Sequence, residues 1–363
     1  MTTIEIVIKA VLAISVGTFA LSLAGFLTWV ERKQSAVIQD RIGANRATIF
    51  GFRILGLFHP IADVLKLIMK EDFTPRHAHK FLFQLAPILS VFFAIIAFAA
   101  IPVGDTITIG SKIFNLQVVN LNIGILYVFA FMSMGIYGVV LAGFASNNNY
   151  SFLGGLRAIS QMLSYEIAMG VSIIGLCMIY ETVGLQEMVR AQGQYCFFGI
   201  IPKWGIVVQP LGFLLFLTAA MAETKRTPFD LPEGESEIIG YNLEYSGMKF
   251  AMFMMTDFLE TVLISALLTT LFLGGWQVPY LSPEGFQFPG GWHIPLGHLS
   301  VVVLGILSFI AKVIFFCWFL MMVRWTLPRF RYDQLMRLGW KMMLPLALAN
   351  IVITGLLILL GVI

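Results

Sequence analysis

Long apolar runs with very few charged side chains constrain this chain more than any other feature. A hydrocarbon layer about 30 Å thick is crossed by about 20 residues of α-helix. Because the backbone must be satisfied inside a bilayer, and because the polar alternation of barrel strands is missing, we expect helices. The prediction is an all-α integral membrane protein in which residues 1–363 form a single membrane domain. About eight transmembrane helices are expected, at 10–30, 81–103, 121–145, 158–180, 205–222, 250–273, 299–323 and 342–363.

The composition excludes several classes of protein. Hydrophobic residues make up 58% and charged residues 12% of the chain, against about 25% charged in soluble domains, so a soluble core is excluded. Cys177, Cys196 and Cys317 have no CxxC or CxxH partner, so we expect neither a metal site nor an iron–sulfur cluster. The five histidines lie outside the apolar runs, which disfavours haem, and the net charge of +3 without a basic face disfavours nucleic acid.

The distribution of Lys and Arg predicts the topology. Of the 23 basic residues, 18 fall in loops 31–80, 146–157, 223–249 and 324–341. By the positive-inside rule these loops face the cytoplasm or matrix, and both termini lie on the periplasmic or intermembrane side. The first apolar run is longer than the core of a signal peptide, so we interpret it as a spanning helix.

A surface helix is expected between the first two spans. Apolar Ile54, Phe58, Ile61, Leu65 and Met69 recur at intervals of three or four, with charged residues between them. This pattern is typical of an amphipathic helix on the membrane surface, although a soluble surface helix would look similar. The proline at position 60 predicts a bend.

Four ionisable residues within the spans are unusual: Glu166, Asp257, Glu260 and Lys312. A charge at the centre of a membrane helix costs about 2.5–3.5 kcal/mol on insertion scales, so such residues face a bundle interior or a polar path. They are candidates for proton handling, and a static buried ion pair is the alternative. Asp257 and Glu260 share a helical face, so we expect one of them to be neutral or paired.

The densest polar segment lies between the fifth and sixth spans. It holds six carboxylates, which are Glu223, Asp230, Glu233, Glu235, Glu237 and Glu244. Two prolines and a glycine break helix formation there, and apolar residues such as Phe229 alternate with the acids. We expect the segment to pack into protein, where burial raises carboxyl pKa values; a solvated loop is the alternative.

A second marked segment, residues 31–46, follows the first span. Its arginines, Arg32, Arg41 and Arg46, anchor the helix end to lipid headgroups in the simplest interpretation. Gly43 and Asn45 indicate a tight turn that would fix the neighbouring side chains.

These two segments and three shorter motifs carry a family resemblance over almost the whole chain. They read E-R-K at 31–33, R-I-G-A-N at 41–45, P-I-A-D at 60–63, S-Y-E at 164–166, A-E-T-K-R-T-P-F-D-L-P-E-G-E-S-E at 222–237 and Y-N-L-E-Y-S at 241–246. With them the chain resembles the H subunit of NADH–quinone oxidoreductase (respiratory complex I), the counterpart of mitochondrial NADH dehydrogenase subunit 1. Ala44 stands where the family usually has proline, which makes this turn less rigid.

The resemblance implies a subunit without a redox centre of its own. Its substrate would be a quinone such as ubiquinone, held in a chamber shared with hydrophilic partner subunits that carry the terminal iron–sulfur cluster. Small membrane subunits and antiporter-like subunits would be further partners, in a bacterial inner or a mitochondrial inner membrane. No complete active site would lie in this chain alone.

The resemblance also implies roles for individual residues. The quinone chamber would involve Glu31, Arg32, Arg41, Gly43, Asn45, Arg46, Asp63 and Phe229. Proton coupling would involve Glu166, Glu223, Asp230, Glu233, Glu235, Glu237, Glu244 and Asp257. Glu260 has no counterpart among the family's acids.

Three other functions remain open on the sequence. A membrane component of an energy-converting hydrogenase would share the acidic loop without holding quinone. A stand-alone proton or ion transporter would also place acids within spans, but we find no internal repeat. A structural membrane anchor would leave the intramembrane charges unexplained.

Overall fold

The structure is a computed structural model that describes residues 3–109, 112–196, 201–232, 234, 240–287 and 292–361. The long helices are α1 (Thr3–Ile38), α3 (Lys80–Ala97), α4 (Gly124–Ala145), α5 (Asn149–Tyr180), α9 (Gly247–Phe272) and α10 (His298–Thr326). The shorter ones are α2 (His59–Met69), η1 (Phe98–Ala100), α6 (Leu185–Gln192), α7 (Gly205–Val208), α8 (Pro210–Glu223) and α11 (Tyr332–Arg337), which continues through a π-helical turn (Leu338–Met343) into α12 (Leu344–Leu359).

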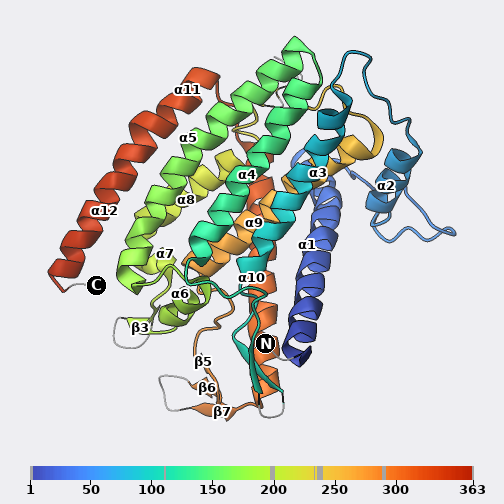
Figure 1. The fold of residues 1–363 in the computed structure, drawn as a ribbon. Helices are drawn as coiled ribbons and strands as arrows, with labels where there is room; N and C mark the ends of the chain where they lie inside the picture. Colours follow the sequence, from blue (N-terminus) through green and yellow to red (C-terminus); the bar gives the residue numbers. More distant parts are fainter. Residues whose placement is uncertain are drawn as a thin grey trace.

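The helices form a bundle with α9 at its centre (Figure 1). Helix α9 packs against α1, α3, α8 and α10. Its most apolar stretch is 72% buried inside the protein, whereas that of α1 is only 11% buried. The side chains of α9 therefore face protein on most sides, while most of the surface of α1 is not covered by this chain.

Seven helices in the described part of the chain are long and apolar enough to cross a membrane. They correspond to seven of the eight predicted spans, and this confirms an all-α integral membrane protein. The remaining segment, predicted at 205–222, is divided into α7 and α8 at Gln209. The ring of Pro210 disfavours the helical conformation at the preceding residue, and the backbone of Gln209 is accordingly non-helical, with φ −133° and ψ 62°.

The side chain of Gln209, at this break, is paired inside the protein. The buried Gln209 side chain accepts a hydrogen bond from Asn350 Nδ2 at 2.8 Å and donates one to Thr354 Oγ1 at 2.5 Å. Both partners lie on α12, so the interruption also attaches the last helix to the bundle. Buried amides need such partners, because an unpaired one costs several kcal/mol in an apolar medium.

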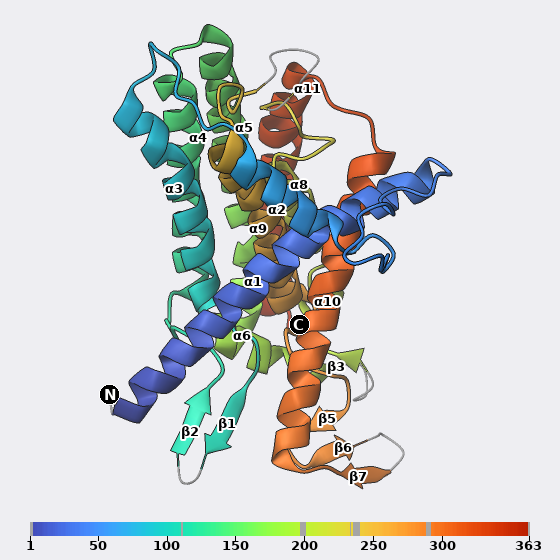
Figure 2. The ribbon, with the colours of Figure 1, turned by 90° about the vertical axis from the view of Figure 1, so that its right-hand side faces the viewer.

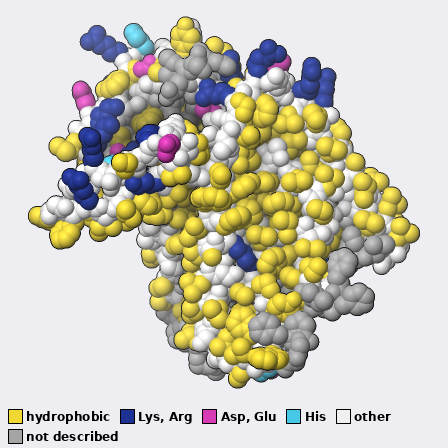
Figure 3. Space-filling model, turned by 180° about the vertical axis from the view of Figure 1, so that it is seen from behind, with side chains coloured by type: hydrophobic (Ala, Val, Ile, Leu, Met, Phe, Trp, Pro, Cys, Tyr) yellow, Lys and Arg dark blue, Asp and Glu magenta, His cyan; other side chains and the backbone are white. Residues whose placement is uncertain are grey.

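Both described ends of the chain lie toward the same end of the bundle (Figures 1 and 2). The antiparallel pairs β1 (Thr106–Ile109) with β2 (Lys112–Asn115) and β3 (Tyr195–Cys196) with β4 (Ile201–Pro202) are in this region. So is the antiparallel sheet of β5 (Leu281–Ser282), β6 (Gly285–Gln287) and β7 (His293–Pro295). Lys and Arg side chains gather at the opposite end, above a face covered by hydrophobic side chains (Figure 3).

The predicted surface helix is present as α2, at the margin of the bundle beside α1 (Figure 1). It is shorter than its apolar pattern and begins at His59, so Ile54 and Phe58 precede it. The predicted bend at Pro60 is wrong because this proline lies in the first turn, where a missing N–H breaks no helical hydrogen bond. None of the residues in α2 is buried.

Candidate functional site

A polar cavity of about 210 Å³ lies at the basic end of the bundle. It is enclosed by the end of α1, the segment after α8, the first half of α9 and the end of α10. Its charged lining residues are Glu31, Lys225, Arg226, Asp230, Asp257 and Arg324. Segments nearly 300 residues apart in the sequence thus contribute to one site.

Glu31 connects three of these elements. Its carboxylate lies 2.6 Å from Arg324 Nη1 on α10 and 3.4 Å from Arg226 Nη1 in the segment after α8. The Arg226 guanidinium also lies over the Phe258 ring of α9, with 4.1 Å between its central carbon and the ring centroid. An arginine can both stack on a ring and pair with a carboxylate, so this arrangement fixes the end of α1 against α9 and α10.

Lys225 is almost completely buried and lies between two carboxylates of α9. Its Nζ is 3.3 Å from Asp257 and 3.4 Å from Glu260. The expectation was that one of the two acids is neutral or paired, and in the structure both pair with the same lysine. A buried ammonium needs such partners because of its desolvation cost.

Glu223, at the end of α8, continues this group of charges into the protein. It is 2% exposed, and the neighbouring carboxylates that act on it electrostatically are Glu166 and Glu260. Glu166, on α5, accepts a hydrogen bond from the Ser133 hydroxyl of α4. Four helices therefore bring acids or their partners together although the sequence separates them widely.

Gln161 of α5 holds the segment after α8 in place. Its Nε2 donates to the carbonyl oxygens of Ala222 at 2.8 Å and Phe229 at 2.7 Å. Phe229 is buried, and its ring centroid lies 5.5 Å from that of Tyr165. Gln161 was not among the residues predicted from the sequence, although an amide within an apolar span was a signal that could have identified it.

The described parts of the acidic segment are packed into protein. Asp230 pairs with Arg329 at 2.7 Å, and burial raises the pKa of its carboxyl although Arg329 acts in the opposite direction. Glu244 accepts a hydrogen bond from Asn148 Nδ2 at 2.7 Å. Three of the predicted acids, Glu233, Glu235 and Glu237, lie outside the described residues.

The predicted turn after α1 exists, but its arginines do not line the cavity. Gly43 has φ +71°, and a Cβ there would lie 2.6 Å from that of Ala36, so only glycine fits without displacement. Arg41 donates to Gln39 and is exposed, as is Arg46, while Asn45 is half-buried. Next to this turn, Arg32 on α1 pairs with Asp63 on α2 at 2.7 Å.

Lys312, the fourth intramembrane charge, has different partners. Its Nζ donates to the backbone carbonyls of Leu273, Gly275 and Gln277 at 2.6–3.0 Å. It also lies 4.6 Å from the centroid of the Trp204 ring. Lys312 thus holds the turn after α9 rather than joining the acids.

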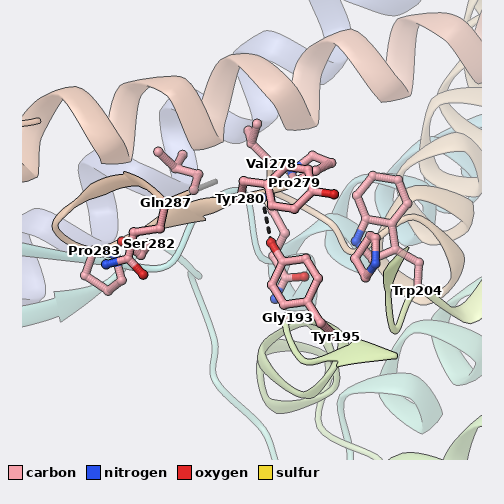
Figure 4. Close-up of a pocket in the computed structure, with 12 residues that line it drawn as sticks. Gly193, Tyr195, Trp204, Val278, Pro279, Tyr280, Ser282, Pro283 and Gln287 are labelled. Atoms are coloured by element: carbon pink, nitrogen blue, oxygen red, sulfur yellow. Dashed lines mark hydrogen bonds between the residues drawn. The ribbon is translucent and has the colours of Figure 1, made fainter. Parts of the chain in front are cut away.

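A second pocket, of about 290 Å³, lies near that turn, at the end of the molecule with the hairpins. Tyr195, Trp204 and Tyr280 face it, and the Tyr280 backbone N–H donates to the Tyr195 hydroxyl (Figure 4). None of the described residues that line it is charged. The polar cavity is therefore the better candidate for charge-linked chemistry. Among the described residues, no cluster of His, Cys, Asp and Glu could hold a metal ion.

Comparison with known proteins shows the family to which the chain is similar. The profile of the NADH dehydrogenase family matches residues 9–355. The chain is 45% identical to the NADH-quinone oxidoreductase H subunit 1 of Cytophaga hutchinsonii, over 97% of both chains. It is 42% identical to the H subunit of Flavobacterium psychrophilum, over 98% of both chains, and to that of Thermomicrobium roseum, over 94% of this chain and 93% of the relative. The chain therefore belongs to the NADH dehydrogenase family, together with proteins named as H subunits of NADH-quinone oxidoreductase.

Proposed function

We propose that this chain is the membrane subunit of a proton-translocating NADH:quinone oxidoreductase that forms the quinone chamber and couples quinone reduction to proton pumping. The observation that carries the proposal is the sequence of charged side chains that leads from the cavity into the bundle. It runs from Glu31 and Arg226 to Lys225 and Asp257, and then to Glu223 and Glu166. Buried carboxylates in such a series can respond to one another's charge.

The cavity is the end of the series at which quinone chemistry would act. Reduction of a quinone to a quinol takes up two electrons and two protons, so charge appears and is neutralised beside the cavity wall. Two unit charges 4 Å apart in a protein interact by on the order of 4 kcal/mol, which is enough to move a proton between neighbouring carboxyl groups. The chain supplies the acids, and partner subunits with an iron–sulfur cluster would supply the electrons.

The other predicted residues take the remaining roles in this proposal. Arg32 and Asp63, which join α1 to α2 beside the cavity, would form part of the chamber wall. Phe229, Gly43, Asn45, Arg41 and Arg46 would complete the chamber together with partner subunits. Asp230, Glu233, Glu235, Glu237 and Glu244 would transmit the change of charge through the acidic segment. The basic end would face the cytoplasm of a bacterium, with both termini in the periplasm.

Glu223→Gln in the assembled enzyme tests the proposal. We expect NADH–quinone turnover and the associated proton pumping to fall by roughly tenfold or more, because a positioned proton carrier is lost. NADH oxidation by a hydrophilic acceptor, which needs no quinone, should stay normal. The matched control is Glu284→Gln, a neutralised acid that is exposed in the turn before β6.

Undiminished quinone turnover and pumping in assembled Glu223→Gln enzyme would remove this residue from the mechanism. If membranes that contain the wild-type chain and its partners reduce no quinone with NADH, the proposed function itself is wrong.

A further inference from the structure

Glu260 is the one buried acid of this group that the family resemblance does not explain. It lies on α9 and is 8% exposed. A membrane helix carries such a cost only where the side chain has partners or a function. The charged groups that face Glu260 are Lys225, Asp257, Arg226 and Glu223.

Its position differs from that of Asp257, although the two acids share Lys225. Asp257 lines the cavity, whereas Glu260 is one helical turn further along α9 and does not line it. Glu260 instead reaches toward α4, where its Oε1 lies 4.0 Å from the place that a Cβ on Gly135 would occupy. Ser133, which donates to Glu166, is two residues away on the same helix.

We propose that Glu260 is a proton-relay residue of this chain, held by Lys225 between Asp257 at the cavity and the interior pair Glu223 and Glu166. This inference rests on the proposed function and adds a residue to it. Two cations, Lys225 and Arg226, face this group, and Arg226 also pairs with Glu31. They do not balance the four acids Asp257, Glu260, Glu223 and Glu166, so protons are shared among these acids. A proton that leaves Glu260 is accepted by the carboxylate of Glu223, and Glu260 is then an anion that Lys225 stabilises. A proton from the Asp257 side restores it, so charge is conserved at each transfer.

The alternative role for Glu260 is that of a static counter-ion for Lys225. Asp257 already lies at 3.3 Å from this lysine, so a second carboxylate is not required to neutralise it. A counter-ion also has no need to reach the helix that binds Glu166. The two roles differ in one respect that can be measured, which is whether the side chain must be able to carry a proton.

Glu260→Gln and Glu260→Asp in the assembled enzyme separate these roles. Gln keeps the shape and an oxygen that can accept from Lys225 but carries no exchangeable acidic proton, whereas Asp keeps the acid and shortens its reach. We expect Glu260→Gln to lower the pumping rate per assembled complex roughly tenfold. Glu260→Asp should recover much of this rate, with a larger solvent deuterium isotope effect than the wild type. Thr269→Val, a neutral change at a buried position of the same helix, should pump like the wild type.

Three outcomes would overturn the proposal. The first is an unchanged pumping rate per complex in Glu260→Gln, whether or not less complex assembles. The second is an equal loss in the Gln and Asp variants, because an acid that restores none of the rate means that the ion pair of the full-length carboxylate with Lys225 matters, and not its proton. The third outcome applies if the Gln variant does not assemble, so that only Glu260→Asp can be measured. A pumping rate and an isotope effect in Glu260→Asp that both equal those of the wild type would then overturn the proposal. In each case quinone turnover by the wild type stays as a separate test of the proposed function.

Discussion

Lys225, which is buried, contacts the middle of α9, whereas Lys312, which is half-buried, contacts the turn after α9 and has different partners. Lys225 lies between the carboxylates of Asp257 and Glu260, close to the polar cavity. Lys312 is held by three backbone carbonyls in the turn after α9 and by the face of Trp204. Both arrangements compensate the desolvation of an ammonium group.

The difference between the partners decides what each lysine can do. A carboxylate can accept a proton, so the charge around Lys225 can change during a reaction. A backbone carbonyl remains a neutral acceptor, so the environment of Lys312 is fixed. A buried charge within a span is therefore evidence of proton handling only when its partners can titrate.

Lys225→Met gives the largest expected effect. Two carboxylates would lose their shared cation, and removal of one partner from a buried ion group costs on the order of 3 kcal/mol or more. We expect much less assembled complex in the membrane and a strong loss of pumping in what remains. The control is Lys249→Met, at a lysine of α9 whose partner Asp72 is 46% exposed. Normal assembly and pumping in Lys225→Met would remove the distinction between the two lysines.

Lys312→Met should have a smaller and purely structural effect. Three carbonyls would lose their donor, at about 1–3 kcal/mol of stability, while the cost of burying the ammonium disappears. Thermal unfolding of the purified complex should begin at a lower temperature. Pumping per assembled complex should equal that of the wild type. A pumping defect without a loss of stability would instead mean that Lys312, like Lys225, takes part in proton handling.

Asp230→Asn changes a more exposed ion pair than that of Lys225, and its effect on stability should be the smallest of the three. Burial raises the pKa of Asp230, so the folded protein binds its proton more tightly than the unfolded chain. This contribution therefore favours folding in acid and is lost as the pH rises above about 3.8 and through the folded pKa. Asp230→Asn lacks this dependence and keeps an acceptor for Arg329.

The measurement is thermal unfolding of the complex in detergent between acid and neutral pH. As the pH rises over this range, the unfolding temperature of the variant should increase slightly relative to that of the wild type. The corresponding change in the free energy of unfolding should be less than about 1 kcal/mol. A relative fall with rising pH would mean that Arg329 lowers the pKa more than burial raises it.

The candidate site could be predicted from the sequence only in part. The acids Glu166, Glu223 and Asp257 were identified because charges within or beside apolar spans are costly. Gln161 was missed, and so was the grouping of Arg226 and Arg324 around Glu31. Their contacts join residues 61 to nearly 300 positions apart, and hydropathy contains no information about which helix faces which.

By itself, the sequence determined the properties that depend on local composition. Runs of about 20 apolar residues must be helices in a bilayer, basic loops collect on one side of it, and the acidic motif indicates the family. Only the tertiary structure decided that α9 is the central helix, that the fifth span is broken at Gln209, and that Lys225 is shared by two acids. The physical reason is that spans are selected one helix at a time by transfer from water to lipid. The partners of a buried charge depend on the rotation and depth of several packed helices at once.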